Sequence, residues 1–183
     1  NFYLGIKMQK KVAFLNVAAL AVAGFLSQSA FAQDGTINFE GEIVDSTCSV
    51  SPKSQNMTVP LGKVRTSVLA AAGSSATPSR FIIELLDCDA AKAKVSFSGP
   101  PDGDHATLLR LAGGLVGTTQ ASNVAVEISD SSGTKIPLGA ASNEYTILKG
   151  ENSLQFQAKY VSVKGGATAG IANATAQFTV AYY

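Results

Sequence analysis

Residues 172–183 read Ala172-Asn-Ala-Thr-Ala-Gln-Phe-Thr-Val-Ala-Tyr-Tyr183, with small or apolar side chains at every even position up to Tyr182. Asparagine, threonine and glutamine occupy the odd positions up to 179. This period of two predicts a β-strand with one buried and one solvated face. Because the sequence stops at Tyr183, we expect an unpaired edge beside apolar core, which favours addition of another chain. Alternatively, this strand lies inside its sheet between two local neighbours.

The same period of two recurs in the rest of the chain and predicts an all-β sandwich. Clusters of Gly, Ser, Asp and Pro at 98–103, 129–133 and 164–166 predict loops between the strands. The alanine-rich stretch 67–76 allows one helical turn, which Gly73 and Pro78 prevent from extending. No internal repeat or domain boundary is visible within residues 45–183, which we assign to one domain. The predicted strands are 37–44, 57–61, 81–86, 94–98, 124–129, 154–163 and 174–183.

Residues 1–32 have the pattern of a secretory signal peptide. Lys10 and Lys11 precede the apolar run 12–26, and Ala30-Phe-Ala32 supplies small residues before a cleavage site that we place ahead of Gln33. The apolar run is shorter than the roughly 20 residues that a membrane-spanning helix needs. The sequence therefore predicts an exported protein.

Residues 1–7 precede Met8, which occupies the position of an initiator, and are left out of the fold prediction. The charge balance of the remaining chain bears on two classes of partner. Removing residues 1–32 takes away three lysines and no acid, which leaves 11 basic against 13 acidic residues. This balance does not favour binding to nucleic acid or to an anionic membrane.

Two cysteines, Cys48 and Cys88, remain in a chain that the signal sends to an oxidising compartment. One structural disulfide between them is the expected state. The loop that it closes, about 40 residues long, corresponds to roughly 4 kcal/mol of stabilisation in the chain-entropy treatment.

The first predicted strand has its own alternation, with Gly35, Ile37, Phe39 and Gly41 on one face. No obvious partner for it exists in the sequence. Two large anchors between two glycines suit insertion into a groove of another subunit by strand addition. The alternative is an ordinary first strand that pairs within its own sheet. The residues alone leave both possibilities open.

Residues that carry catalytic or metal chemistry are scarce. Asp102, Asp104 and His105 cluster in one Gly- and Pro-rich loop, where we interpret them as hydrated turn residues and assign no metal. His105 is the one histidine in the chain, and neither cysteine has a plausible catalytic partner. No glycine-rich phosphate motif follows a strand and opens a helix. The sequence predicts a protein that is not an enzyme, with no cofactor and no small-molecule substrate.

Three stretches in this order and spacing resemble the major pilins of chaperone-usher fimbriae, particularly the type 1 pilus class. They are Gly35-Thr-Ile-Asn-Phe39-Glu-Gly41-Glu-Ile-Val44 leading into Cys48, Val59-Pro-Leu61-Gly62-Lys-Val64, and Phe81-Ile-Ile-Glu-Leu-Leu-Asp-Cys88. At the far end, Gly170 is fourteenth from the last residue and Tyr182 is penultimate, which is similar to the family's chaperone-recognition pattern. The resemblance covers all of residues 33–183.

The resemblance implies an incomplete immunoglobulin-like sandwich that lacks its last strand and is completed by donor-strand exchange. Residues 33–44 would be the donated extension and 45–183 the pilin domain. A periplasmic chaperone would cover the groove first, and identical or related subunits would replace it at an outer-membrane usher. By analogy, the donated residues are Gly35, Ile37, Phe39 and Gly41. Those of the groove and of chaperone recognition are Gly170, Ala176, Phe178, Val180 and Tyr182.

The resemblance further implies a shaft subunit on the surface of a Gram-negative bacterium, acting in cell adhesion. Cleavage before Gln33 leaves only two residues ahead of Gly35, so the extension is short and its distal anchor is in question. Alternative functions are a minor adaptor or terminator subunit of the same fold, or a monomeric secreted β-sandwich that binds a ligand. A tip adhesin would need an additional lectin domain.

Overall fold

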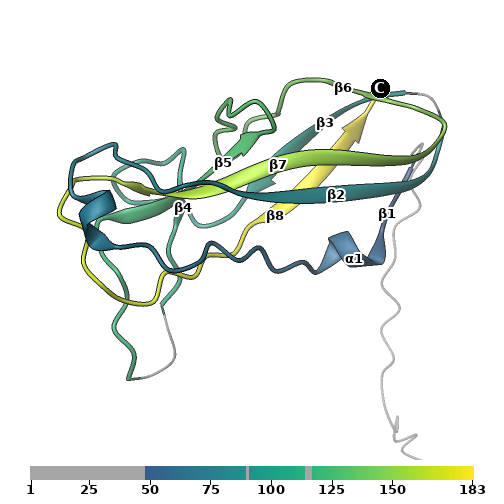
Figure 1. Ribbon diagram of the computed structural model, residues 1–183. Helices are drawn as coiled ribbons and strands as arrows, with labels where there is room; N and C mark the ends of the chain where they lie inside the picture. Colours follow the sequence, from purple (N-terminus) through teal and green to yellow (C-terminus); the bar gives the residue numbers. More distant parts are fainter. Residues whose placement is uncertain (1–47, 90, 114–116) are drawn as a thin grey trace, which may run out of the picture. The chain divides into compact units, whose positions relative to one another are not determined.

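The computed structural model describes residues 48–89, 91–113 and 117–183 (Figure 1). Two antiparallel sheets make up this part of the chain, with strand orders β1-β2-β7-β5-β4 and β6-β3-β8. No helix within these ranges is long and apolar enough to cross a membrane. The elements are β1 (Ser49–Val50), α1 (Pro52–Gln55), η1 (Thr66–Leu69), β2 (Ser79–Cys88), β3 (Ala91–Ser98), β4 (Leu109–Arg110), β5 (Val124–Asp130), β6 (Tyr145–Ile147), β7 (Gly150–Ser162) and β8 (Gln177–Tyr182).

The central pairs of the larger sheet are β2 with β7 and β5 with β7. Core-facing residues of β2 and β7, such as Ile83 and Phe156, are fully buried, and most of the residues between them are partly buried or exposed, whereas β5 is buried along nearly all of its length. The predicted all-β sandwich is therefore confirmed. The strands predicted at 81–86, 94–98 and 124–129 lie within β2, β3 and β5, and the strand predicted at 154–163 matches β7 except for its last residue.

An aromatic cluster joins the two sheets at the middle of the core. Phe81 of β2 stacks on Phe156 of β7 with ring centroids 5.6 Å apart, and Phe97 of β3 meets Phe156 edge-on at 5.2 Å. Edge-to-face and offset contacts of this kind add to the burial of the rings themselves. Tyr145 of β6 contacts the same Phe156 ring at 5.6 Å. The smaller sheet is thus packed against the larger one through its central strand.

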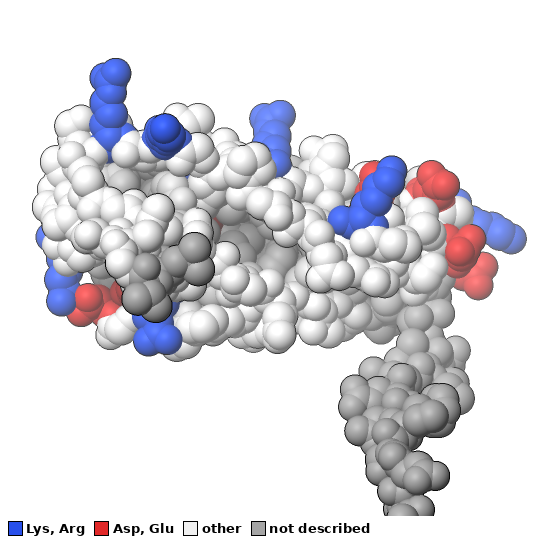
Figure 2. All heavy atoms as spheres, turned by 90° about the horizontal axis from the view of Figure 1, so that it is seen from below, with Lys and Arg blue, Asp and Glu red and all other residues white. Residues whose placement is uncertain are grey.

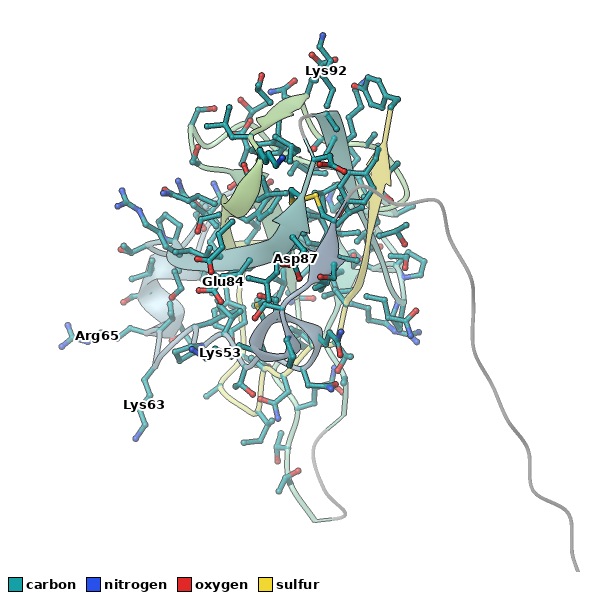
Figure 3. All side chains as sticks on the ribbon, turned by 90° about the vertical axis from the view of Figure 1, so that its right-hand side faces the viewer. Lys53, Lys63, Arg65, Glu84, Asp87 and Lys92 are labelled. Carbon is teal, nitrogen blue, oxygen red and sulfur yellow. A yellow bond between two sulfur atoms is a disulfide. The ribbon has the colours of Figure 1, made fainter. Side chains whose placement is uncertain are left out.

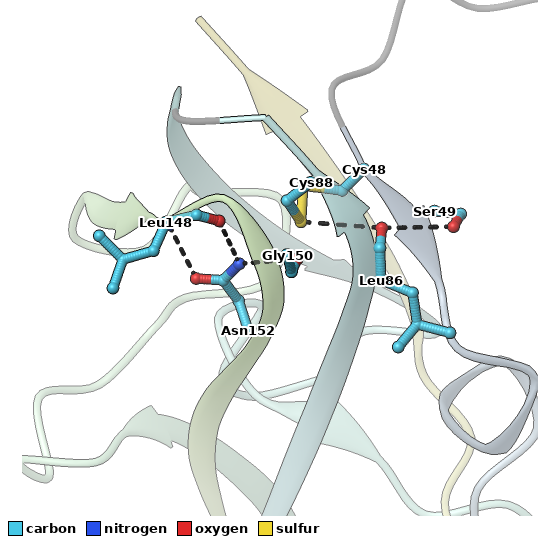
Figure 4. The surroundings of a disulfide bond; sticks show 7 residues. All are labelled: Cys48, Ser49, Leu86, Cys88, Leu148, Gly150 and Asn152. Atoms are coloured by element: carbon cyan, nitrogen blue, oxygen red, sulfur yellow. Dashed lines mark hydrogen bonds between the residues drawn. A yellow bond between two sulfur atoms is a disulfide. The ribbon is translucent and has the colours of Figure 1, made fainter.

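The disulfide predicted from the cysteine count is confirmed (Figure 4). It joins Cys48, just before β1, to Cys88 at the end of β2, and both residues are buried. Because β1 pairs with β2 over only two residues, the covalent link holds a short edge strand in register. In the adjacent turn, the Asn152 side chain exchanges hydrogen bonds with the backbone of Leu148.

A tight turn follows β5 and is organised by the buried side chain of Asp130. Its Oδ1 accepts hydrogen bonds from the Ser132 hydroxyl at 2.6 Å and from the N–H groups of Ser132 and Thr134 at 2.9 Å. The Asn143 amide donates to Oδ2 at 3.1 Å. The Ser132 hydroxyl bond, supported by these backbone and amide bonds, lowers the pKa of Asp130 below its ordinary value.

Two predictions of secondary structure need correction. Residues 57–61 were expected to form a strand, and this expectation is wrong: they are extended but belong to no β-ladder in the described chain. Pro60 lacks the N–H that a ladder requires. The last strand begins at Gln177 rather than at 174, because the residues before it make only isolated bridges. The helical turn expected within 67–76 occurs as η1, one residue earlier.

Candidate functional site

Within the described residues, the last strand, β8, lies at an edge of the smaller sheet. It pairs with β3 along one side, with Phe178 opposite Phe97 and Val180 opposite Val95. On its other side no strand of the described ranges pairs with it. Among the described residues, the hydrogen-bonding groups along that side thus have no ladder partner, and such an edge can take an added strand. The alternative of a last strand between two local neighbours does not hold for these residues.

A groove of about 610 Å³ opens beside this edge. Its first wall is the chain that leads into β8, residues 172–178. The backbone carbonyl of Ala172 accepts a hydrogen bond from the Tyr160 hydroxyl at 2.7 Å, and the carbonyl of Asn173 accepts one from the Ala112 N–H at 2.6 Å. These two bonds from other elements hold the wall in place where no β-ladder does.

The second wall is the extended segment 57–62, which runs between α1 and η1. The Ser79 hydroxyl at the start of β2 donates to the carbonyl of Pro60 at 2.8 Å and ties this wall to the larger sheet. Met57 and Leu61 are partly buried against the core clusters. Neither this segment nor the free side of β8 has a ladder partner among the described residues, and the groove lies between them.

The floor of the groove consists of core residues from both sheets. Phe81 and Phe97 lie at right angles there, with ring centroids 6.2 Å apart. Of the described residues that line the groove, none is an Asp, Glu, Lys, Arg or His. Burial raises the pKa of Tyr160, so its hydroxyl stays neutral. The remaining floor residues are Leu109, Val126, Ile128 and Ala158.

Exposure along β8 differs from exposure along its partner strand. Ala93, Val95 and Phe97 of β3 are 0–3% exposed, as expected for a core strand. Phe178 and Val180, directly opposite on the same face, are only partly buried. The alternation predicted for the last strand is present, but the side chains on its apolar face are only partly covered by the described residues. Apolar surface of this kind on a sheet edge is typical of an interaction site.

The five residues proposed for the groove and for chaperone recognition occupy three different places. Ala176 and Phe178 line the groove. Val180 and Tyr182 continue the same face of β8 and pack against the core cluster that contains the disulfide. Burial raises the pKa of the Tyr182 hydroxyl. Gly170 lies outside the groove.

At Gly170, the chain approaches another segment closely. A Cβ at this position would lie 2.5 Å from the carbonyl carbon of Gln120 and 2.7 Å from the carbonyl oxygen of Thr119. Gly170 therefore permits this close backbone contact, two residues before the first wall begins. Gly99 does the same at the end of β3, where a Cβ would lie 2.9 Å from the Thr175 carbonyl oxygen.

The proposed donor residues, Gly35, Ile37, Phe39 and Gly41, lie outside the described residues, as does the predicted strand 37–44. The signal segment 1–32 lies outside them too. These assignments remain predictions.

The loop that holds Asp102, Asp104 and His105 shows internal turn contacts. Asp102 Oδ1 accepts the N–H groups of Asp104 at 3.0 Å and of His105 at 3.1 Å. Asp104 pairs with Lys164 at 2.9 Å, and His105 Nε2 lies 3.3 Å from the Val163 carbonyl oxygen. These contacts match the interpretation as turn residues. Within the described ranges, no group of three or more His, Cys, Asp or Glu is placed to hold a metal ion.

Sequence reasoning about the site missed the second wall and the floor. The stretch Val59-Pro-Leu61 was noticed as part of a family pattern, but its location at the groove could not be seen. The floor residues carry only the general signal of core-facing apolar positions in their strands. That signal identifies core residues and does not tell which of them remain uncovered.

Comparison with known proteins identifies the fold and the family together. A family profile described as fimbrial protein matches residues 37–183. The type-1 fimbrial protein C chain of Escherichia coli is 41% identical over 175 residues, which cover 93% of this chain and 96% of that protein.

Solved structures agree with the family profile. The P pilus rod subunit PapA aligns with a TM-score of 0.62 and 25% identity, over 75% of this chain and all of that one. A chaperone-usher pilus structure that addresses rod uncoiling aligns with a TM-score of 0.64 and 26% identity, over 82% and 96% of the two chains. With an incomplete immunoglobulin-like sandwich open beside its last strand, this chain belongs to the fimbrial protein family, as a structural subunit of a chaperone-usher pilus on the surface of Gram-negative bacteria.

Proposed function

We propose that this subunit polymerises by strand donation, with residues 33–44 of one copy entering the groove of the next. The observation that carries the proposal is the open edge of β8 beside an uncharged groove with an apolar floor. An extended segment there would extend the smaller sheet by one strand and cover the partly exposed Phe178. Backbone hydrogen bonds give such an added strand its affinity, and side-chain pockets give it specificity.

The donated segment suits the groove in its pattern of side chains. Ile37 and Phe39 fall on one face of the strand, and burying each large side chain contributes roughly 1.5–3 kcal/mol. Gly35 and Gly41 on the same face allow close approach to the groove walls. Donor and acceptor are different surfaces of one subunit, so the contact is heterologous and produces an open filament.

An open groove is a hazard for a subunit that has not yet assembled, because exposed core and free strand edges promote aggregation. We therefore propose that a periplasmic chaperone covers the groove until an outer-membrane usher allows the next subunit to replace it. Membership of the chaperone-usher family supports these partners. Val180 and Tyr182, which extend the open face of β8 toward the disulfide, are the proposed chaperone contacts together with Gly170.

The comparisons favour a shaft subunit over the alternatives. The matched relatives include a probable major fimbrial subunit of Escherichia coli O157:H7 that is similar in length to this chain. A minor adaptor or terminator would share the fold, but a terminator would be expected to lack a usable N-terminal extension, and residues 33–44 offer a plausible one. An unrelated monomeric sandwich is inconsistent with the family match.

The experiment compares the full mature chain from Gln33 with the variant Ile37→Ser/Phe39→Ser, which removes both anchors. We expect the wild-type chain to form polymers during refolding and the variant to remain monomeric, as measured by size-exclusion chromatography with light scattering. A synthetic peptide of residues 33–44 should then bind the variant and raise its melting temperature.

The matched control is Thr36→Ser/Asn38→Ser, which places the same residue type on the opposite face of the donated strand. This control should polymerise like the wild type. Polymerisation of the anchor variant at the wild-type rate, or a peptide that leaves its melting temperature unchanged, would contradict strand donation.

A further inference from the structure

The second wall of the groove has basic residues on both sides of it in the sequence, and no acidic residue lies nearby in that part of the chain. Lys53 lies in α1 just before the wall, and Lys63 and Arg65 follow it directly. Between residues 48 and 79 the sequence contains these three charged residues and no Asp or Glu. We call Lys53, Lys63 and Arg65 the basic rim.

The three side chains of the basic rim are exposed and have no ion-pair partner within the described chain. Figure 3 shows them on one side of the molecule, with Lys63 and Arg65 projecting away from the ribbon. Lys53 lies below Glu84 in this view, and the Glu84 N–H donates to Ser54 Oγ in α1 at 2.9 Å. No ion pair between Lys53 and Glu84 occurs in the described chain, and Lys63 and Arg65 are the two cations of the basic rim that directly follow the wall.

The opposite wall carries no charge. Residues 165–183, which include the first wall and β8, contain no Asp, Glu, Lys, Arg or His. In Figure 2, the face seen from below is hollowed near its middle, with several blue side chains along its upper edge and most of the acidic ones gathered at its right-hand end. Of the two segments that contain the walls, residues 48–79 therefore carry the three cations of the basic rim, whereas residues 165–183 carry no charged side chain.

The segment proposed to enter the groove has the opposite charge. Residues 33–44 contain Asp34, Glu40 and Glu42 and no Lys, Arg or His. Glu40 and Glu42 alternate with Phe39 and Gly41, so they fall on the face of the strand that stays outside when the anchors enter. The α-amino group of a chain that begins at Gln33 would offset one of the three negative charges.

We propose that the basic rim attracts the acidic outer face of the donated strand from a second copy of this chain, and so accelerates strand insertion. This inference rests on the strand donation proposed above and adds the determinant of its rate. Insertion of apolar anchors gives stability to the finished junction, whereas the charges outside the groove act before contact is made. Exposed charges at the rim of an interface typically change the association rate and its salt dependence rather than the dissociation rate.

The range of the attraction sets the expected size of the effect. The screening length is about 30 Å at 10 mM salt and about 8 Å at physiological ionic strength, so an exposed cation acts well beyond contact only at low salt. Complementary fields raise association rates by about 10- to 1,000-fold in strongly charged systems. With two to three charges on each side, we expect the association rate to fall about tenfold between 10 and 500 mM NaCl.

The test uses the full mature chain with Ile37→Ser/Phe39→Ser as an acceptor that cannot donate its own strand. A fluorescent peptide of residues 33–44 is mixed with it, and the association rate is followed by stopped-flow anisotropy from 10 to 500 mM NaCl. Adding Lys63→Gln/Arg65→Gln to the acceptor should lower the low-salt rate several-fold and flatten the salt dependence. The dissociation rate should change less than twofold.

Three further comparisons keep the result interpretable. A Glu40→Gln/Glu42→Gln peptide should show the same flattened salt dependence on the unmodified acceptor, without any change to the protein. Lys149→Gln, an exposed lysine in the turn between β6 and β7 and outside the groove lining, serves as the matched control and should leave the rate unchanged. A Lys63→Glu/Arg65→Glu acceptor should prefer a Glu40→Lys/Glu42→Lys peptide over the natural one.

The outcomes separate this inference from the proposal that it rests on. Peptide binding with a rate independent of salt, or equal rates for the natural and the Glu40→Gln/Glu42→Gln peptides, would overturn the role of the basic rim while strand donation stands. No peptide binding at any salt concentration would overturn both. An equal loss of rate in the Lys149→Gln control would show a general charge effect and would also refute the rim.

Discussion

Phe178→Ala tests whether the groove beside β8 is filled in the assembled state. In the free subunit Phe178 is partly buried, opposite Phe97. Removal of a fully buried Phe side chain costs about 3–5 kcal/mol, so removal of the mostly buried Phe178 should cost about 3 kcal/mol in the free subunit. An inserted strand would complete its burial and raise the cost to about 4 kcal/mol. The difference of about 1 kcal/mol corresponds to roughly 5-fold weaker binding of the strand.

The assay measures the Kd of the peptide of residues 33–44 on the Ile37→Ser/Phe39→Ser acceptor, with and without Phe178→Ala. Urea unfolding of both acceptors without peptide supplies the cost in the free subunit. Thr179→Ala is the matched control, because Thr179 lies on the outward face of the same strand. A Kd within twofold of the unsubstituted acceptor, or an equal weakening by Thr179→Ala, would refute the reasoning.

Three further predictions concern stability of the subunit. Cys48→Ser/Cys88→Ser should lower the free energy of unfolding by about 4 kcal/mol in urea, and a loss below 1 kcal/mol would contradict the loop-closure argument. Asp130 has a lowered folded-state pKa, so its contribution is present above the unfolded-chain pKa of roughly 3.9 and is lost as pH falls through the folded-state pKa. Asp130→Asn should therefore flatten the loss of stability between pH 5 and pH 2, and an unchanged profile would refute this. Gly170→Ala should cost about 1–3 kcal/mol through backbone overlap, whereas Gly103→Ala, with open space around it, should be neutral in thermal melts.

The long central strands were predictable because their signal is local. β3 and the middle of β7 alternate apolar and polar side chains, whereas β2 and β5 are rich in apolar and β-branched residues over seven residues or more. The short strands β1, β4 and β6 were not predicted, since two or three residues carry no readable period. Their ladder partners far along the chain decide that they are strands.

The site was predicted in part for the same reason. Ala176 and Phe178 were found because they belong to the clearest alternation in the chain. The strand predicted at 57–61 was wrong, even though a similar apolar pattern is present in that stretch. Whether an extended segment is a strand depends on a neighbour that pairs with it, and the described residues place none beside Pro60.

The sequence by itself determined the all-β class, the cysteine pair that forms the disulfide and the family, because these depend on local periodicity, residue counts and motif order. Only the tertiary structure decided that the groove lies between segment 57–62 and the chain leading into β8, with a floor drawn from both sheets. A groove is a property of what remains uncovered after distant segments have packed together. Burial of each apolar residue depends on all of its neighbours in space. The local pattern of a strand does not indicate which of its apolar residues lack a neighbour that covers them.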